Sequence, residues 1–125
     1  MKHYLREPVN ALTHLIGAVL SLIGTLYLLI FTHTSLSCAA IISVIIFGLS
    51  LIALYTTSGV YHLVIANEQV ILKLKKLDHS MIFILIAGSY TPFCLLSLNG
   101  AWKWSILSIV WILAILGITL KIFWI

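Results

Sequence analysis

The sequence predicts an all-α fold: a polytopic bundle of transmembrane helices, with about four spans in a single domain that covers residues 1–125. Hydrophobic residues make up 62% of the chain and charged residues only 8%, and the mean hydropathy is +1.21. Soluble domains carry roughly 25% charged residues, so this chain has too few charges to cover a surface that faces water. Long uncharged runs are the third observation, since about 20 apolar residues in a helix cross the hydrocarbon core of a bilayer.

The first half of the chain supplies two of these spans. Residues 11–31 form an uncharged run, which as a helix is about 31 Å long at about 1.5 Å per residue and matches the hydrocarbon core. Residues 38–66 form the second span, and no Asp, Glu, Lys or Arg occurs between Leu36 and Ala66. This run is longer than one crossing needs, so we expect the helix to tilt or to extend past the lipid at one end.

The second half supplies two more spans, at residues 80–98 and 104–122. Residues 67–78 between the second and third spans are polar and rich in Lys, and we expect them to form a loop in which residues 70–77 can form an interfacial amphipathic turn. Asn99-Gly100 predicts a tight turn before the fourth span. The hydrophobic pattern then continues to Ile125, so we expect a piece of a longer protein from which C-terminal helices are missing.

Small residues on the predicted helices indicate where they pack together. Gly17 and Gly24 lie on the first helix, Gly48 and Gly59 on the second, and Gly88 on the third. Small side chains let membrane helices approach closely, so we interpret these positions as packing surfaces rather than as a functional site.

The basic residues predict how the helices are oriented. Lys2 and Arg6 precede the first span and a group of Lys follows the second, whereas the opposite side holds only Lys103. Cytoplasmic segments carry an excess of Lys and Arg, so the N-terminus is predicted to be cytoplasmic and the protein to be a multi-pass protein of the plasma membrane. No stripe of aromatic and basic residues is present, which argues against nucleic acid as a partner and leaves membrane lipids.

Most of the informative polar residues fall at the predicted cytoplasmic ends of the first three helices. Ser58 and His62 are four residues apart and therefore share a helix face, and Asn10 and His14 repeat that spacing. Ionisable residues at such depths are costly and usually face the bundle or a water-filled cavity. Neutral imidazole binds metal ions, and a nearby carboxylate such as that of Asp78 can orient the ring or a metal-bound water.

Plainer interpretations of the same residues stay open. A His near a helix end is more often an interfacial residue than a ligand. Asp78 is also suited to cap a third helix that begins directly after it, since Asp is a favoured N-cap residue and its charge suits the helix dipole. The plainer role of Ser58 is a hydrogen bond within its own helix or to a neighbouring helix.

Taken together, the motifs resemble those of the hemolysin III family. Residues 7–14 resemble its E-x-x-N-x-x-T-H opening, and residues 58–62 resemble its S-x-x-x-H motif on the second helix. Residues 77–80 resemble its D-H block, and residues 86–93 resemble its I-A-G-S-Y-T-P segment. The order and spacing of the motifs agree with the family along essentially the whole chain. The family is related to the progestin and adiponectin receptor proteins and to a wider superfamily of membrane hydrolases that includes alkaline ceramidases.

The resemblance implies seven helices, a cytoplasmic N-terminus and a zinc ion near the cytoplasmic face. It makes His62 a zinc ligand, Asp78 the residue that positions the zinc-bound water, and Ser58 a residue that shapes the pocket around the transition state. The family's other two zinc ligands come from an H-x-x-x-H motif on the last helix, which this sequence lacks. His14 and His79 are conceivable substitutes without support from the family. Since zinc needs about three protein ligands, we expect this chain alone to be inactive.

Three functions follow as hypotheses. The first is a zinc-dependent hydrolase that acts on lipid-like amides or esters. The second is a cytolytic, pore-forming protein as the family name suggests, although the sequence contains no ring of charges that would line a pore. The third is a receptor-like membrane protein in which zinc only stabilises the bundle.

Overall fold

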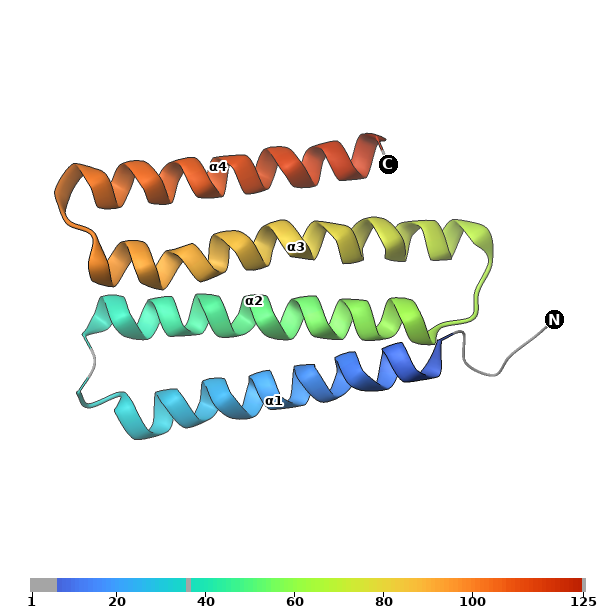
Figure 1. Ribbon diagram of the computed structural model, residues 1–125, viewed down its shortest axis with the longest axis horizontal. Coiled ribbons are helices and arrows are strands. Elements are labelled where there is room, and N and C mark those ends of the chain that lie inside the picture. Colours follow the sequence, from blue (N-terminus) through green and yellow to red (C-terminus); the bar gives the residue numbers. More distant parts are fainter. Residues whose placement is uncertain (1–6, 36, 125) are drawn as a thin grey trace.

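The computed structural model describes residues 7–35 and 37–124, and these residues form four long helices with no strand among them. The helices are α1 (Pro8–Thr32), α2 (Cys38–Leu63), α3 (Glu68–Ser97) and α4 (Gly100–Trp124) (Figure 1). Each is long and apolar enough to cross a membrane. The predicted all-α fold with four spans is therefore confirmed. Lys2 and Arg6, on which the orientation prediction partly rests, lie outside the described residues.

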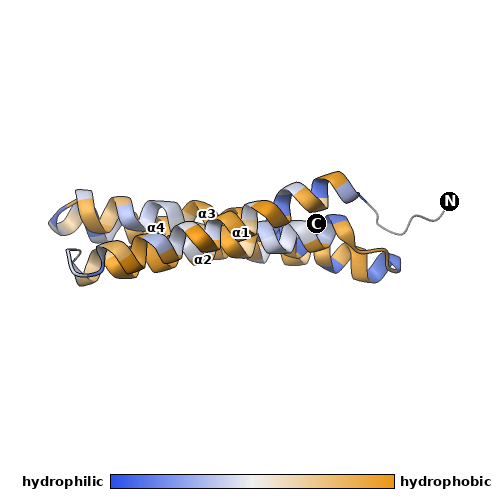
Figure 2. Cartoon of the chain, turned by 90° about the horizontal axis from the view of Figure 1, so that it is seen from below, coloured by the Kyte–Doolittle hydropathy of each residue, from blue (hydrophilic) through white to orange (hydrophobic). Residues whose placement is uncertain are grey.

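The four helices lie side by side in chain order, each antiparallel to the one before it (Figure 1). Within the described part of the chain, only consecutive helices contact each other: α1 with α2, α2 with α3, and α3 with α4. Two faces of this layer are consequently uncovered, and many large apolar side chains are exposed, most of them on the outer helices α1 and α4. Figure 2 shows hydrophobic residues along the middle of the helices and hydrophilic residues toward their ends, the distribution expected for helices surrounded by lipid.

Glycines set the close approach of neighbouring helices. A Cβ atom on Gly17 would lie 2.9 Å from Cδ1 of Tyr55, and one on Gly59 would lie 2.6 Å from Cδ2 of Leu15. Similar overlaps would set Gly48 against Thr25 and Gly88 against Ser50. The packing interpretation holds at these four glycines because a neighbouring side chain fills the space that their missing side chains leave.

Gly24 does not belong to this packing surface, contrary to the prediction. Nothing lies within 4 Å of the position that its Cβ atom would take. The glycine next along the face, Gly17, is in contact with Tyr55. A shared sequence pattern therefore does not distinguish a glycine at an interface from one beside open space.

Helix α3 begins well before the predicted span, and the loop predicted at residues 67–78 is wrong. Asn67 caps the helix, since its side-chain oxygen accepts a hydrogen bond from the backbone N–H of Val70 at 2.9 Å. Glu68 follows in the first turn, where a negative charge suits the helix dipole. The 30 residues of α3 span about 45 Å, more than the hydrocarbon core requires, so its Lys-rich first turns can lie outside the lipid.

The remaining boundaries are close to the predicted spans. Helix α2 ends at Leu63, three residues before the end of the predicted span, and the backbone of residues 64–67 leads to α3. Leu98 and Asn99 join α3 to α4, and Gly100 has φ +58°, in the region that favours glycine. This is the tight turn that Asn99-Gly100 predicts.

Candidate functional site

Polar residues of α1, α2 and α3 share one end of the layer, as the packing register shows. Ser50 of α2 lies opposite Gly88 of α3. The two helices are antiparallel, so ten residues forward from Ser50 on α2 and ten residues back from Gly88 on α3 lead to Val60 opposite Asp78. Asp78 therefore lies at a depth between those of Ser58 and His62. The structure thus brings these three predicted site residues to a common level, as the sequence predicts. Their chemical roles remain predictions.

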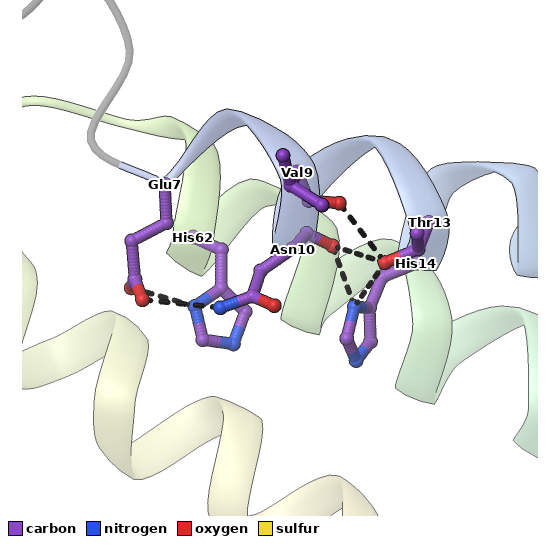
Figure 3. A network of polar contacts seen from close by, with 6 residues as sticks. All are labelled: Glu7, Val9, Asn10, Thr13, His14 and His62. Carbon is purple, nitrogen blue, oxygen red and sulfur yellow. Dashed lines mark hydrogen bonds and ion pairs between the residues drawn. The ribbon is translucent and has the colours of Figure 1, made fainter.

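Glu7 connects the start of α1 to the last turn of α2. Its backbone N–H donates a hydrogen bond to the carbonyl oxygen of His62 at 2.8 Å. Its carboxylate oxygen Oε1 lies 2.8 Å from Nδ1 of the His62 ring (Figure 3). A carboxylate only accepts hydrogen bonds, so the ring nitrogen that faces it carries the proton. In a neutral ring the other nitrogen, Nε2, then keeps its lone pair and is the atom able to bind a metal ion.

Asn10 extends this contact along the first turns of α1. Its side-chain Nδ2 donates to Oε2 of Glu7 at 3.2 Å, so both carboxylate oxygens have a partner. Its backbone carbonyl lies 2.6 Å from Nδ1 of His14, and this contact assigns the proton of the His14 ring to Nδ1. Figure 3 shows both imidazole rings on the same side of α1, with the nitrogen Nε2 of each pointing away from these partners.

The two rings lie close to each other and to aromatic neighbours. The centroids of His14 and His62 are 5.5 Å apart, and Tyr61 lies 5.0 Å from His62. The ring of Tyr55 lies 6.1 Å from that of His14. The side chain of His62 is 20% exposed, so the ring is enclosed on most sides but reachable.

Ser58, Asp78 and His79 complete the set of polar residues at this end. Ser58 is buried, with 6% of its surface exposed, and Asp78 and His79 are half-buried. Asp78 is not an N-cap residue, because α3 begins ten residues earlier at Glu68, and that interpretation is therefore wrong. Among the described residues, Nδ1 of His79 is buried and has no hydrogen-bond partner.

The donor atoms present fit one zinc ligand rather than a whole site. His62 has the arrangement that metal-binding His usually shows: a carboxylate holds Nδ1, and Nε2 is left to bind the metal. Within residues 7–35 and 37–124, however, no three His, Cys, Asp or Glu side chains gather closely enough to hold a metal ion. His14 and His79 therefore do not complete a zinc site with His62 in this part of the chain. A zinc site requires further ligands from elsewhere.

Glu7 is the residue whose role sequence analysis missed. It stands first in the motif at residues 7–14, yet its partner His62 follows 55 residues later. No local pattern connects two residues so far apart. An acidic side chain directly before an apolar span was the available signal, because a charge beside the membrane needs a partner or water.

Nearly the whole chain is similar to known proteins. Residues 2–125 match the family described as "Haemolysin-III related". The chain is 40% identical to "Hemolysin-3" of Bacillus cereus over 126 residues, which is 100% of this chain and 57% of that protein. It is 43% identical to "Hemolysin-3 homolog" of Bacillus subtilis (strain 168) over 119 residues, which is 95% of this chain and 55% of that protein. The chain thus spans about half the length of the curated relatives that it matches. No solved structure matches it.

Proposed function

The chain belongs to the haemolysin-III-related family of integral membrane proteins, and on that premise we propose that the full-length protein is a zinc-dependent hydrolase of lipid-like amides or esters. The observation that carries the proposal is the arrangement at one end of α1–α3. His62 is held through Nδ1, its Nε2 is available, and it lies within a few residues' depth of Ser58 and Asp78. Polar and ionisable side chains gathered at one depth in a membrane protein are typical of a functional site.

Each of the three residues has a distinct role in this proposal. His62 would hold the zinc through Nε2, together with ligands from outside the described residues. Bound zinc would lower the pKa of a coordinated water to about 7 and so make it a nucleophile at neutral pH. Asp78 would orient that water and accept its proton, a role that suits a carboxylate at this depth. Ser58, buried on the same face of α2 as His62, shapes the pocket around the scissile bond.

An apolar groove supports a lipid-like substrate. It has a volume of about 600 Å³, lies between α1 and α2, and extends to Pro92 of α3. Gly17 and Tyr55 line it near the polar end, and Tyr27 and Val44 line it toward the other end. The groove therefore starts close to His14, against which Tyr55 packs, and continues into the region of the hydrocarbon core. An acyl chain in the groove would leave its amide or ester near the polar residues.

The proposed site lies near the cytoplasmic face of the plasma membrane. Lys73, Lys75 and Lys76 are at the same end of the layer as His62, whereas Lys103 follows the α3–α4 turn at the opposite end. The positive-inside rule assigns the end with more Lys to the cytoplasm. A substrate would accordingly reach the site from the inner leaflet.

Metal analysis of the purified full-length protein tests the proposal. We expect about one zinc per chain, by analogy with other catalytic zinc sites, and its loss in the His62→Ala variant. Glu68→Ala is the matched control, because Glu68 is an exposed acidic residue at the same end of the layer. Protein that contains no zinc, or that keeps its zinc after His62→Ala, would contradict the proposal. Zinc without turnover of any lipid amide or ester would favour a receptor-like protein with structural zinc.

Cytolysis is the second candidate function, because the two relatives carry the name hemolysin. A liposome-leakage assay separates it from the first. If purified protein releases an encapsulated dye and still does so after His62→Ala, membrane permeabilisation does not depend on the proposed zinc ligand and the pore is favoured. If no leakage occurs while a lipid amide or ester is hydrolysed, the enzyme is favoured.

A further inference from the structure

We infer that Glu7 is a positioning residue for His62: it holds the imidazole with the proton on Nδ1 and so keeps Nε2 available as the metal-binding atom. This inference rests on the proposed function where zinc is concerned. The orientation and protonation of the ring are properties of the chain itself, and they can be measured without any metal.

Glu7 contacts His62 twice. The backbone N–H of Glu7 donates to the main-chain carbonyl of His62 at 2.8 Å, and Oε1 lies 2.8 Å from Nδ1 of its ring. The main-chain contact fixes where the two helix ends meet, and the side-chain contact fixes the ring within that junction. A neutral imidazole whose Nδ1–H donates to a carboxylate has Nε2 without a proton.

The carboxylate of Glu7 is itself held by hydrogen bonds. Oε2 of Glu7 accepts a hydrogen bond from Nδ2 of Asn10 at 3.2 Å, while Oε1 faces His62. Asn10 lies one turn along α1, so the helix that begins at Pro8 determines the direction of the carboxylate. The chain Asn10–Glu7–His62 thus passes orientation from the backbone of α1 to a ring on α2 (Figure 3).

The contact between Glu7 and His62 also matches the usual surroundings of zinc-binding His residues. His residues that bind zinc almost always donate their other N–H to a carboxylate, a backbone carbonyl or water, and removal of such a partner typically lowers metal affinity about 10- to 100-fold. Glu7 has the position and the acceptor atom for this role. His14 has a weaker version of the arrangement, with a backbone carbonyl as the acceptor.

The first experiment measures which nitrogen of His62 carries the proton. The full chain is labelled with ¹⁵N-His, reconstituted in lipid nanodiscs without metal, and the His62 signals are assigned by their loss in His62→Ala. We expect the proton on Nδ1 in the unsubstituted chain and on Nε2, the commoner form, in Glu7→Ala. Glu7→Gln should restore the Nδ1 form, since an amide oxygen also accepts a hydrogen bond. All variants keep the backbone N–H of residue 7 and therefore the main-chain contact.

The outcomes of this experiment are decisive for Glu7. A His62 ring with its proton on Nε2 in the unsubstituted chain would overturn the inference, as would an unchanged ring in Glu7→Ala. Glu68→Gln is the control for loss of an acidic residue at this end, and it should leave the signals as they are.

The second experiment measures zinc affinity of the full-length protein by competition with a chelating dye. We expect the dissociation constant to rise about 10- to 100-fold in Glu7→Ala and to stay unchanged in Glu68→Gln. An unchanged constant in Glu7→Ala would overturn the role of Glu7 toward zinc. Full-length protein that binds no zinc at all would instead remove the proposed function, while the ¹⁵N measurement still decides whether Glu7 sets the His62 ring.

Discussion

The hydroxyl of Ser50 occupies the space that a side chain on Gly88 would need. Ser50 also donates a hydrogen bond to the carbonyl of Ile46 at 2.7 Å, so its position is set by its own helix. This contact fixes the register of α2 against α3, and with it the depth of Asp78 relative to Ser58 and His62.

Gly88→Ala should therefore destabilise the α2–α3 pair. The added methyl group would overlap Oγ and Cβ of Ser50, and inserting a methyl group into a packed interface typically costs about 1–3 kcal/mol. The measurement is the free energy of unfolding from detergent micelles by SDS titration, followed by circular dichroism. Gly24→Ala is the matched control, because its Cβ would meet nothing within 4 Å. Equal stability of the two variants would contradict the register.

Thr91→Val should weaken the α3–α4 contact. Trp111 donates a hydrogen bond from Nε1 to Oγ1 of Thr91 at 3.1 Å, and Thr91 is 2% exposed. Valine has the same shape without the hydroxyl, so the indole N–H would lose this acceptor. Hydrogen bonds between membrane helices contribute about 0.6–1.7 kcal/mol, and we expect a loss of that size in the same SDS titration. Thr91→Ser keeps the hydroxyl and should lose less stability than Thr91→Val. A larger loss of stability in Thr91→Ser would contradict the role of this hydrogen bond.

Lys76→Met should loosen the end of α4. Nζ of Lys76 donates to the backbone carbonyl of Ile122 at 2.8 Å, in the last turn of α4, where a positive charge also suits the helix dipole. We expect faster amide hydrogen exchange in the last turn of α4 in this variant. Lys75→Met serves as the control, since it removes the neighbouring exposed charge. Equal exchange in both variants would show that the Lys76 contact contributes nothing to this turn.

Labelling of introduced cysteines should place His62 and Asp78 on the same side of the membrane. In a chain whose Cys38 and Cys94 are replaced by Ala, residues 62, 78 and 99 are each changed to Cys in separate variants. A membrane-impermeant maleimide applied to intact cells should spare positions 62 and 78 and react at position 99. Labelling of positions 62 and 78 from opposite sides would end the case for a shared site, because α2 and α3 would then not lie in the observed register.

The four-span fold was predictable because it depends on composition. In lipid a long uncharged run is stable as a helix, because a helix satisfies its own backbone hydrogen bonds. All four runs form helices. The start of α3 was not predictable in the same way. The Lys residues of the segment 67–78 suggested a loop, whereas its helix depends on a cap by Asn67 and on the apolar spacing of Val70 and Leu74.

The depth of the candidate site was predictable and its detailed contacts were not. Helix ends and topology alone place Ser58, His62 and Asp78 near one face of the membrane, and the register agrees. The contact between Glu7 and His62 depends on how the ends of two helices meet, which no spacing along a single helix reveals. The family relationship was recognisable from short motifs, and the family model matches residues 2–125.

The described helices contact only their neighbours in the sequence, and this arrangement allows the chain to assemble stepwise during synthesis. Across residues 7–35 and 37–124 each helix contacts only its neighbours in the sequence, so the α1–α2 hairpin can close as soon as α2 has left the ribosome. Contacts that are local in the sequence form quickly, and none of those described here requires an earlier helix to wait for a distant one. Insertion can therefore proceed from the N-terminus in steps, and Glu7 can take up its position on His62 before α3 enters the bilayer.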